Sequence, residues 1–473
     1  MKLFNSLTRK IEKIIPLKAP NLGFYACGFT VYDYVHIGHL RRYTMDDVLL
    51  RTLKQAGFKV NFVQNITDVG QLVSDADEGE DKMEKGAKKY QTTVWELAKK
   101  FEDYFFYSMD KMGNLRPDVS CRATEHIPEQ IELVKKLEKN GYTYVIDGDG
   151  VYFDTSKLDD YGEIAQLDIK NLKEGARVDK VVGKRNLTDF ALWKFEREGK
   201  NKSMTWPSPW AERGFPGWHV ECSAMSMKYL GDQFDIHTGG KDHLTIHHPN
   251  EIAQSEAATG KKPFVKYWVH HNFIQVEGEK MSKSLENFFT IDDVEQRGYH
   301  PLALRLLFLT AHYRSEINFT WDNLAGAQKS YQKLIDLVLK LKGDKGEAEG
   351  GDDYRQRFFD FMENDLRTPE ALAVMWEVTK SNLSNATKLK LLLEFDQVLG
   401  LGLSKAEEIN KELGGGEVDL NSLSAEVKDL LDQRQQARDN QDFEKADQLR
   451  QQLQFLGYLV KDTPQGQKII KSK

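Results

Sequence analysis

Short apolar runs and helical patterns alternate along the first part of the chain. An apolar run at 22–28 precedes a segment at 41–57 in which apolar residues recur at helical spacing, and Gly57 is placed to end that helix. A second apolar run follows at 58–67. The order strand, helix, strand predicts a βαβ unit, and therefore an α/β fold class built on a parallel sheet.

The alternation of strand and helix patterns changes between about residues 100 and 200. Two helical patterns, at 92–112 and 126–140, lead into a segment at 141–156 that has the pattern of a β-hairpin with its turn at 147–150. A hairpin that interrupts an α/β pattern is typical of an inserted subdomain. We therefore expect an insertion in this part of the chain, at 119–205.

Apolar runs resume after the insertion, at 233–240 and 264–276, and we expect both to complete the interrupted sheet. From about residue 317 onward the pattern is almost wholly helical. Two polar, glycine-rich stretches at 342–353 and 413–424 are typical of exposed linkers. The last fifty residues are therefore expected to form a small module of their own.

The composition narrows the class of protein. A chain of 473 residues is long enough for roughly two to four domains, and 66 Lys and Arg against 73 Asp and Glu give a net charge of −7. Three cysteines, an odd number, favour reduced thiols over a disulfide framework. No apolar run approaches the roughly 18 residues of a membrane span. We therefore expect a cytoplasmic protein that contacts no membrane.

A first candidate site lies between the first strand and its helix. His36, Gly38 and His39 stand where a helix N-terminus would present free amides to a phosphate group. Two imidazoles three residues apart would add donors to that anion site, and Gly38 would let a flat base approach the backbone. An equally open interpretation is that the two histidines only cap the helix.

A second candidate site is the polar segment 279–284. Lys280 and Lys283, with Ser282 between them, could swing onto a triphosphate and neutralise the charge that moves to pyrophosphate. Taken alone, such a segment is more often a pair of solvated lysines.

Four scattered residues form a candidate metal-ligand set: Cys27, Cys222, His247 and Glu251. His247 and Glu251 are four residues apart, so a helix would point both side chains from one face. Two thiolates, one imidazole and one carboxylate suit zinc and select against calcium or magnesium. From the residues alone, two alternatives stay open: both cysteines are buried apolar thiols, or His248 replaces His247 as the ligand.

The terminal module is slightly basic within an acidic chain, because residues 424–473 hold nine Lys or Arg against eight Asp or Glu. Lys468, Lys471 and Lys473 have no acid among them, so a basic tail behind a helical hairpin could follow a phosphate backbone. A frayed, solvated terminus is an equally open interpretation. The acidic segment Asp75–Asp81 lacks the offsets of a calcium loop and is expected to be exposed.

Together, these residues resemble the cysteinyl-tRNA synthetase family, one of the class I aminoacyl-tRNA synthetases. The segment 36–39 matches the HIGH signature of that family and 280–284 matches its KMSKS signature, each intact. Matching stretches run along effectively the whole chain, among them GWHVECSAM at 217–225, HHPNEIAQS at 247–255 and DTPQGQ at 462–467. This coverage argues against a chance match or a single borrowed domain.

The resemblance implies a Rossmann-like parallel-sheet catalytic domain with an inserted connective subdomain, then a helical bundle and a small C-terminal anticodon-binding domain. The expected parts are the first half of the catalytic domain at 1–118, the connective insertion at 119–205, the second half with the metal ligands at 206–265, a stem-contact region bearing KMSKS at 266–316, the helical bundle at 317–412 and the anticodon-binding module at 420–473. An insertion of this length is too short for a separate editing domain.

The resemblance also implies a cysteine–tRNA ligase, whose partners are L-cysteine, ATP and the cysteine tRNA. Cysteine would attack ATP to give cysteinyl-adenylate, and the cysteinyl group would then pass to the terminal adenosine of the tRNA. We expect a monomer that binds ATP together with magnesium and holds one zinc ion per chain.

The residue roles follow from the family's motifs. The expected catalytic residues are His36, His39, Lys280 and Lys283. The expected ATP-binding residues are His36, Gly38, His39, Lys280, Ser282 and Lys283. The family's zinc ligands fall on Cys27, Cys222, His247 and Glu251, which chooses His247 over His248. The family's cysteine pocket falls on Cys27, Thr67, Trp218 and His237.

Three positions depart from the family's usual pattern near the cysteine pocket, namely Phe29, Thr238 and Pro249, and an acidic insertion stands at 69–81. None removes a zinc ligand or a signature lysine. Two other functions share parts of the pattern: a ligase that joins cysteine to an amino-sugar pseudodisaccharide by the same adenylation chemistry, and a catalytically silent tRNA-binding relative. The terminal module argues against the first, and the intact signatures argue against the second.

Overall fold

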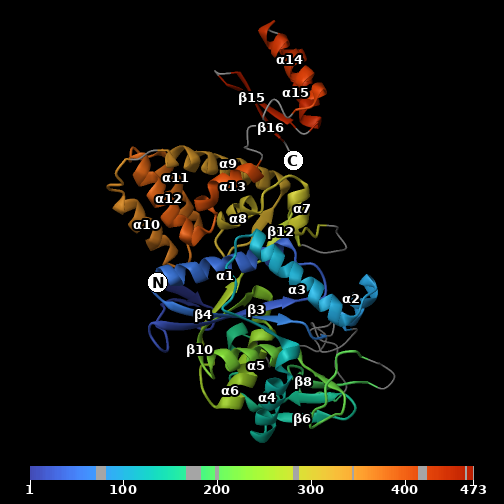
Figure 1. Ribbon diagram of the computed structural model, residues 1–473. Helices are drawn as coiled ribbons and strands as arrows, with labels where there is room; N and C mark the ends of the chain where they lie inside the picture. The colour runs from blue at the N-terminus through green and yellow to red at the C-terminus, as the bar shows by residue number, and fades with distance from the viewer. Residues whose placement is uncertain are drawn as a thin grey trace.

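A parallel five-stranded sheet lies at the centre of the molecule (Figure 1). The computed structural model describes residues 1–70, 81–166, 183–197, 202–280, 287–343, 346–413, 423–440, 442–456, 458–463 and 466–471. The strand order is β11-β10-β3-β4-β5, with bounds β3 Asn21–Thr30, β4 Lys59–Thr67, β5 Val119–Arg122, β10 Phe234–Gly240 and β11 Val265–His271. The strands expected at 22–28, 58–67 and 233–240 are confirmed, and so is the α/β fold class.

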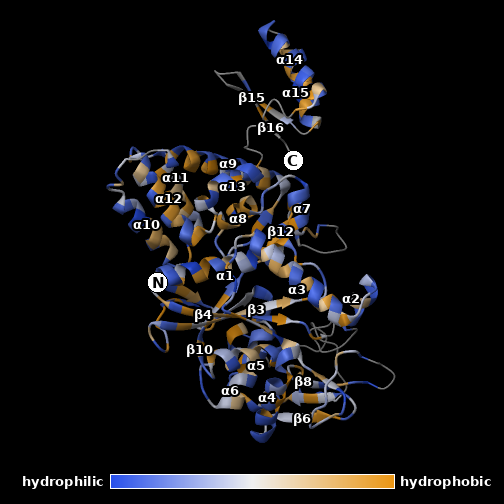
Figure 2. Ribbon diagram, viewed as in Figure 1, coloured by the Kyte–Doolittle hydropathy of each residue, from blue (hydrophilic) through white to orange (hydrophobic). Residues whose placement is uncertain are grey.

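Helices cover both faces of this sheet (Figure 1). One side carries α1 (Ile37–Gln55), α2 (Lys82–Tyr90) and α3 (Val94–Lys111), and the other carries α4 (Ile127–Lys139), α5 (Trp218–Leu230) and α6 (His247–Thr259). Successive side chains of a strand point to opposite faces of the sheet. On β3, Ala26 is buried on the side of α1, and Tyr25 is buried on the side of α5. Burial on both faces explains why β3 is a nearly unbroken apolar run, and Figure 2 shows orange among the strands of the sheet.

A second, antiparallel sheet lies mostly within the segment expected to be an insertion. β6 (Thr143–Ile146), β7 (Gly150–Phe153), β8 (Phe190–Phe195) and β9 (Gly214–Pro216) pair antiparallel in that order. The hairpin expected at 141–156 is confirmed, because Ile146 pairs with Gly150 across its turn. The sheets do not change at the expected boundaries: β5 begins at residue 119 but is the edge strand of the central sheet, and β9 lies beyond residue 205.

The apolar run at 264–276 is two strands in different sheets, so its second part does not complete the central sheet as expected. After β11 the chain enters a small sheet of β12 (Ile274–Val276), β13 (Glu279–Lys280) and β14 (Ile317–Phe319). The break falls at Asn272 and Phe273, whose carbonyl oxygens each accept a hydrogen bond from the Arg41 guanidinium at 2.8 Å. Arg41 lies on α1, so these hydrogen bonds turn the chain out of the central sheet.

The expected helical region packs directly on the central sheet and its helices. Its helices are α7 (Ile291–Gln296), α8 (Pro301–Leu309), α9 (Trp321–Lys342), α10 (Asp352–Met362), α11 (Thr368–Lys380), α12 (Asn385–Leu399) and α13 (Ala406–Glu412). Leu49 of α1, Phe308 of α8 and Phe395 of α12 belong to one buried cluster, so bundle and sheet share a core. A hairpin of β1 (Lys2–Asn5) and β2 (Lys10–Lys13) begins the chain. Among the described helices, none combines the length and apolar character that crossing a membrane requires.

The C-terminal module pairs two helices with a β-hairpin: α14 (Ala425–Asp439), α15 (Phe443–Phe455), β15 (Tyr458–Thr463) and β16 (Gly466–Lys471). The expected helical hairpin is confirmed. Val460 and Ile469 of the two strands are buried in the same cluster as residues of α14 and α15. The alternative of a frayed terminus is therefore wrong as far as Lys471, because Lys468 lies on a paired strand. Lys473 lies outside the described residues.

Candidate active site and metal centre

Helix α1 begins at the carboxyl edge of the parallel sheet. His36 is its N-cap, and Nδ1 of His36 accepts hydrogen bonds from the backbone N–H groups of Gly38 at 3.1 Å and His39 at 3.3 Å. The two histidine rings stack with centroids 3.6 Å apart. A Cβ on Gly38 would lie 2.9 Å from the His36 ring, so this arrangement requires glycine. The two histidines therefore cap the helix, and this is compatible with an anion site, because both rings stay half-buried at the start of a 19-residue helix.

The second signature segment starts from a strand that touches this helix. A Cβ on Gly38 would also meet Cγ2 of Ile274 at 2.9 Å, so β12 lies against the start of α1. β13 pairs with β12 and carries the backbone of Lys280. The structure therefore brings the beginning of the KMSKS segment close to the HIGH segment. Ser282 and Lys283 lie outside the described residues.

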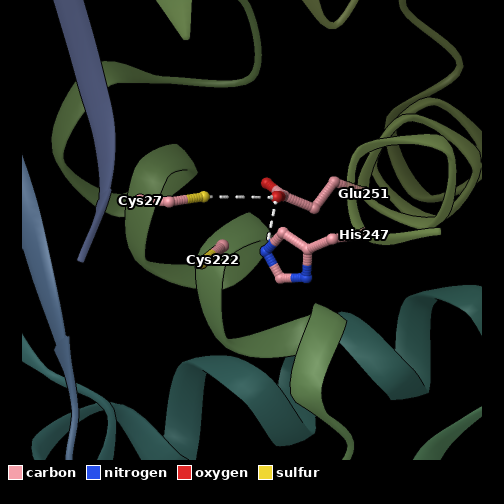
Figure 3. A group of neighbouring side chains, drawn as sticks. All are labelled: Cys27, Cys222, His247 and Glu251. Atoms are coloured by element: carbon pink, nitrogen blue, oxygen red, sulfur yellow. Dashed lines mark hydrogen bonds and ion pairs between the residues drawn. The ribbon is translucent and has the colours of Figure 1, made fainter. Parts of the chain in front are cut away.

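The four predicted metal ligands converge beside the same sheet edge (Figure 3). Cys27 comes from β3, Cys222 from α5, and His247 and Glu251 from the first turns of α6. All four side chains are buried, and their sulfur, nitrogen and oxygen atoms lie within 4.8 Å of one another. Nε2 of His247 is 2.9 Å from Oε1 of Glu251, and Sγ of Cys27 is 4.0 Å from the same oxygen.

The chemistry of this group fits a d-block cation. Two sulfurs, a nitrogen and an oxygen this close could surround one ion at the roughly 2.0–2.3 Å bonds that zinc forms. Burial raises the pKa of the Cys27 thiol, and a hydrogen bond to Cys27 together with burial raises the pKa of Cys222 well above its usual range. Burial opposes a charge on His247, but the Glu251 carboxylate outweighs it and raises the pKa of His247 to about 10. Binding of an ion would therefore displace protons from the thiols and from His247.

Two further histidines support these ligands. Nδ1 of His219 lies 2.9 Å from Nδ1 of His247, and Nε2 of His237 lies 3.0 Å from Oε2 of Glu251. Such outer hydrogen bonds orient the ligating edges of metal-bound side chains. His237, predicted for the cysteine pocket, is therefore in direct contact with a ligand, whereas His219 was missed although it stands three residues before Cys222.

The alternative ligand His248 belongs to a second, overlapping group. Cys27, His237, His248 and Glu251 also offer ligand atoms within 4.8 Å of one another. Nε2 of His248 is 3.5 Å from Sγ of Cys27, and its Nδ1 is 2.7 Å from Nε2 of His270. His247 thus belongs to the group with two sulfurs, and His248 belongs to the group with one.

The other predicted pocket residues border the metal ligands. Trp218 begins α5, and its ring centroid lies 4.5 Å from that of His247. Thr67 ends β4, where its hydroxyl accepts a hydrogen bond from Nδ2 of Asn65 at 3.1 Å. Sequence reasoning missed Asn65, whose Oδ1 lies 3.8 Å from Sγ of Cys222. Its place two residues before Thr67, on the same face of a strand, is the signal that could have indicated it.

The departures from the family pattern are accommodated locally. The ring of Phe29 packs edge-on against His39, with centroids 5.0 Å apart. The carbonyl oxygen of Thr238 accepts a hydrogen bond from Arg42 at 3.3 Å. Pro249 is the third residue of α6, where a missing N–H is tolerated, as the sequence predicts.

The acidic insertion ends in a helix cap. Oδ1 of Asp81 accepts a hydrogen bond from the N–H of Met83 at 2.7 Å and caps α2. The same carboxylate forms an ion pair with Lys202, and both side chains are largely buried. Residues 71–80, which carry most of the insertion's charge, lie outside the described part of the chain.

A buried carboxyl group beside the ligands was also missed. Glu221 directly precedes Cys222, is wholly buried, and has no hydrogen-bond partner at either carboxyl oxygen within the described structure. Burial and the nearby charge of Asp68 raise the pKa of Glu221 well above its usual range. The side chain therefore favours its neutral form, in the position directly before the ligand Cys222.

Comparisons with known proteins match nearly the whole chain. Residues 13–329 match the family model described as tRNA synthetases class I (C) catalytic domain, and residues 420–469 match the cysteinyl-tRNA ligase anticodon binding domain. A protein named cysteine–tRNA ligase 1, from Burkholderia lata, is 45% identical over 99% of this chain and 97% of its own. The chain belongs to the cysteine–tRNA ligase family. Members of this family from Treponema denticola and Caldicellulosiruptor saccharolyticus are each 40% identical, over 98% and 100% of this chain and the same shares of their own.

A solved structure of a different synthetase shares the fold of this cysteine–tRNA ligase family member. Methionyl-tRNA synthetase of Mycobacterium tuberculosis, in complex with methionyl-adenylate, superposes with a TM-score of 0.56 at 15% identity. The match covers 86% of this chain and 96% of that chain. The predicted family, enzyme class and class I synthetase fold are therefore confirmed.

Proposed function

We propose that this chain activates L-cysteine with ATP and transfers the cysteinyl group to the 3′ terminal adenosine of the cysteine tRNA. The observation that carries the proposal is the convergence of the four ligand side chains next to the start of α1. Arg42 of α1 donates a hydrogen bond to the carbonyl oxygen of Cys27 at 2.5 Å, so the two sites adjoin. A thiol-selective metal site and a phosphate-binding helix start are what cysteine activation requires.

Zinc is the ion that Cys27, Cys222, His247 and Glu251 would hold, one per chain. When bound, it would supply a soft Lewis acid for the substrate thiolate. The hydroxyl of serine is harder and far less acidic, and alanine offers no ligand at all. An apolar pocket alone would discriminate such pairs by only about 10- to 200-fold. This chemistry makes a separate editing step unnecessary.

The start of α1 and the KMSKS segment would serve ATP. The cysteine carboxylate forms a bond to the α-phosphorus while the bond to pyrophosphate breaks. His36 and His39 would stabilise the charge on the α-phosphate, and Gly38 would admit the base. Lys280, Ser282 and Lys283 would hold the leaving pyrophosphate, with the magnesium of ATP sharing its charge.

Three residues would shape the cysteine pocket. His237 holds Oε2 of Glu251 at 3.0 Å, which leaves Oε1 directed toward the other ligands. Trp218 packs against the His247 ring and would exclude water from it. Thr67, at the carboxyl end of β4, would offer its hydroxyl to the polar end of the substrate.

ATP–pyrophosphate exchange across the amino acids tests the proposal. We expect cysteine-dependent exchange without tRNA, and charging of the cysteine tRNA when it is added. Absence of exchange in zinc-replete protein would contradict any enzymatic function and favour a silent relative. Exchange without charging would instead favour the amino-sugar ligase, although the match of 420–469 to an anticodon binding domain supports tRNA as the acceptor. The monomeric state and cytoplasmic location stay predictions, which sedimentation and fractionation would test.

A further inference from the structure

The ligand Cys27 lies at an irregularity of the central sheet. In the pairing of β3 with β4, Ala26 is opposite Gln64 and Phe29 is opposite Ile66, so β3 holds one extra residue between these pairs. The resulting bulge interrupts the alternation of side chains. Cys27 belongs to the buried cluster on the α5 side, and Phe29, two residues on, belongs to the cluster on the α1 side. Bulges re-aim side chains in this way beside active sites.

The bulge takes two backbone groups out of the ladder, and side chains satisfy both. The N–H of Gly28 donates to Oδ1 of Asn65 at 2.6 Å. The carbonyl oxygen of Cys27 accepts a hydrogen bond from Nη1 of Arg42 at 2.5 Å, and Nη2 of Arg42 donates to the carbonyl oxygen of Thr238 at 3.3 Å. One guanidinium on α1 therefore joins the ends of two adjacent strands, β3 and β10.

Arg42 is itself held in place. Its Nη2 lies 3.5 Å from Oδ2 of Asp46, one turn further along α1, and the two side chains are only 12% and 2% exposed. The other carboxylate oxygen of Asp46 is 2.8 Å from Nε2 of His271 at the end of β11. A buried polar chain thus links α1 to the carboxyl ends of three neighbouring strands. Such a chain has few alternative arrangements, because each buried group would lose its partner if it moved.

We propose that Arg42 is a positioning residue for the metal ligand Cys27. Its hydrogen bond to the Cys27 carbonyl oxygen holds the bulge so that Sγ of Cys27 points into the ligand group. Because Arg42 lies on α1, the position of Cys27 then depends on the helix that begins at His36. The inference rests on the proposed function, in which the group holds zinc and α1 serves ATP. Arg42 is assigned to neither task, and its planar guanidinium spans two carbonyl groups, those of Cys27 and Thr238, that a single ammonium would hold less firmly.

Metal affinity of the full-length protein tests this role. Arg42→Met removes the donors and keeps an apolar stem, Arg42→Lys keeps the charge, and Arg51→Met is the matched control. Arg51 lies near the opposite end of α1, where it donates to the carbonyl oxygens of Gly113 and Gln397 at 2.8 and 3.2 Å. The variants would be titrated with cobalt(II) and with zinc against a chelating dye, and the KM values for cysteine and ATP would be measured by pyrophosphate exchange.

We expect Arg42→Met to weaken metal binding by about 10- to 100-fold, as the loss of a supporting hydrogen bond typically does. The KM for cysteine should rise with it, whereas the KM for ATP should change by less than about twofold. Arg42→Lys should recover part of the affinity. Arg51→Met should lower the thermal midpoint and leave metal affinity unchanged. If Arg42 had only a structural role, Arg42→Met would behave in the same way as Arg51→Met.

Two results would overturn the proposal: metal affinity in Arg42→Met within about twofold of the unaltered protein, or an equal loss in Arg51→Met. If Arg42→Met does not fold, Arg42→Lys carries the test, and unchanged affinity in that variant refutes the role. The metal titration needs no substrate. Failure of the proposed function would therefore appear separately, as absent cysteine-dependent exchange in the unaltered protein.

Discussion

Replacing Cys222 by serine removes one of the two sulfurs of the ligand group by changing a single atom. Cys222 is 3% exposed, and its Sγ lies 3.8 Å from Oδ1 of Asn65. A serine hydroxyl can donate a hydrogen bond to the same amide oxygen, so the local packing should survive. Serine is nevertheless a poor ligand for a soft ion at neutral pH. The substitution therefore tests metal binding more than folding.

The size of the effect follows from the ligand count. Zinc bound by four ligands near pH 7 contributes about 10–16 kcal/mol, which is about 2.5–4 kcal/mol for each ligand. Since about 1.4 kcal/mol corresponds to a tenfold change, losing the Cys222 thiolate should weaken zinc binding about 10²-fold or somewhat more. The KM for cysteine in pyrophosphate exchange should rise, and the preference for cysteine over serine should fall. The KM for ATP should stay the same, because ATP is assigned to the start of α1.

Cys121 offers a matched control. It is 1% exposed, and its Sγ lies 3.8 Å from the carbonyl oxygen of Gln64, so it resembles Cys222 in burial and contact. Cys121→Ser should lower the free energy of unfolding slightly and change neither zinc affinity nor the KM for cysteine. If Cys222→Ser kept the cysteine KM and zinc affinity of the unaltered protein, or if Cys121→Ser lost as much, the assignment of zinc to substrate recognition would be wrong.

Other parts of the site and the fold give three further expectations. His36→Asn keeps a good N-cap but removes the imidazole, so the exchange rate constant should fall about 10²- to 10³-fold at an unchanged unfolding midpoint; a rate within threefold would leave His36 as a cap only. Arg305→Met removes a wholly buried guanidinium whose Nη2 lies 2.5 Å from Oδ2 of Asp47, and urea titration should show a loss of about 3–5 kcal/mol; a loss under about 1 kcal/mol would contradict this. Because the pKa values of the two thiol ligands and of His247 are raised, zinc binding at pH 7 should release about three protons, and affinity should increase with pH. Calorimetry in buffers of different ionisation enthalpy counts those protons, and a count of one or none would refute the assignment.

The candidate site was largely predictable because its residue types are chemically distinctive. His247 and Glu251 stand four apart on a helix, and the HIGH and KMSKS segments are intact, so their residues could be named from the chain alone. The supporting residues could not be named, because Asn65 and Arg42 act through contacts with β3 that arise only when the sheet forms. Residue type identifies a ligand, whereas a supporting group is recognised by its neighbours.

Two parts of the fold were harder to predict for physical reasons. The run at 264–276 contains the polar residues His270, His271 and Asn272, where it divides, but the change of sheet is held by Arg41, which lies 231 positions from Asn272 in the chain. The terminal β-hairpin was not predicted, because Lys468, Lys471 and Lys473 give that segment the composition of a solvated tail. Val460 and Ile469, on either side of the turn, are the apolar residues that bury the two strands. The local hydrophobic pattern therefore predicted the secondary structure correctly where a segment's own residues determine it. The pattern failed at 264–276, where a contact with the distant helix α1 determines it.

Helix α1 packs against both the central sheet and the helical bundle, because all three share one buried core. Arg51 of α1 donates a hydrogen bond to the carbonyl oxygen of Gln397 on α12, and Arg305 of α8 donates one to the carbonyl oxygen of Leu399. The other end of α1 begins at His36. An RNA that pressed on the bundle would therefore act on a helix whose other end begins the proposed nucleotide site, because one buried core joins the two. The buried residues of α14–β16 form separate clusters, so that module does not share the core that joins the sheet to the bundle.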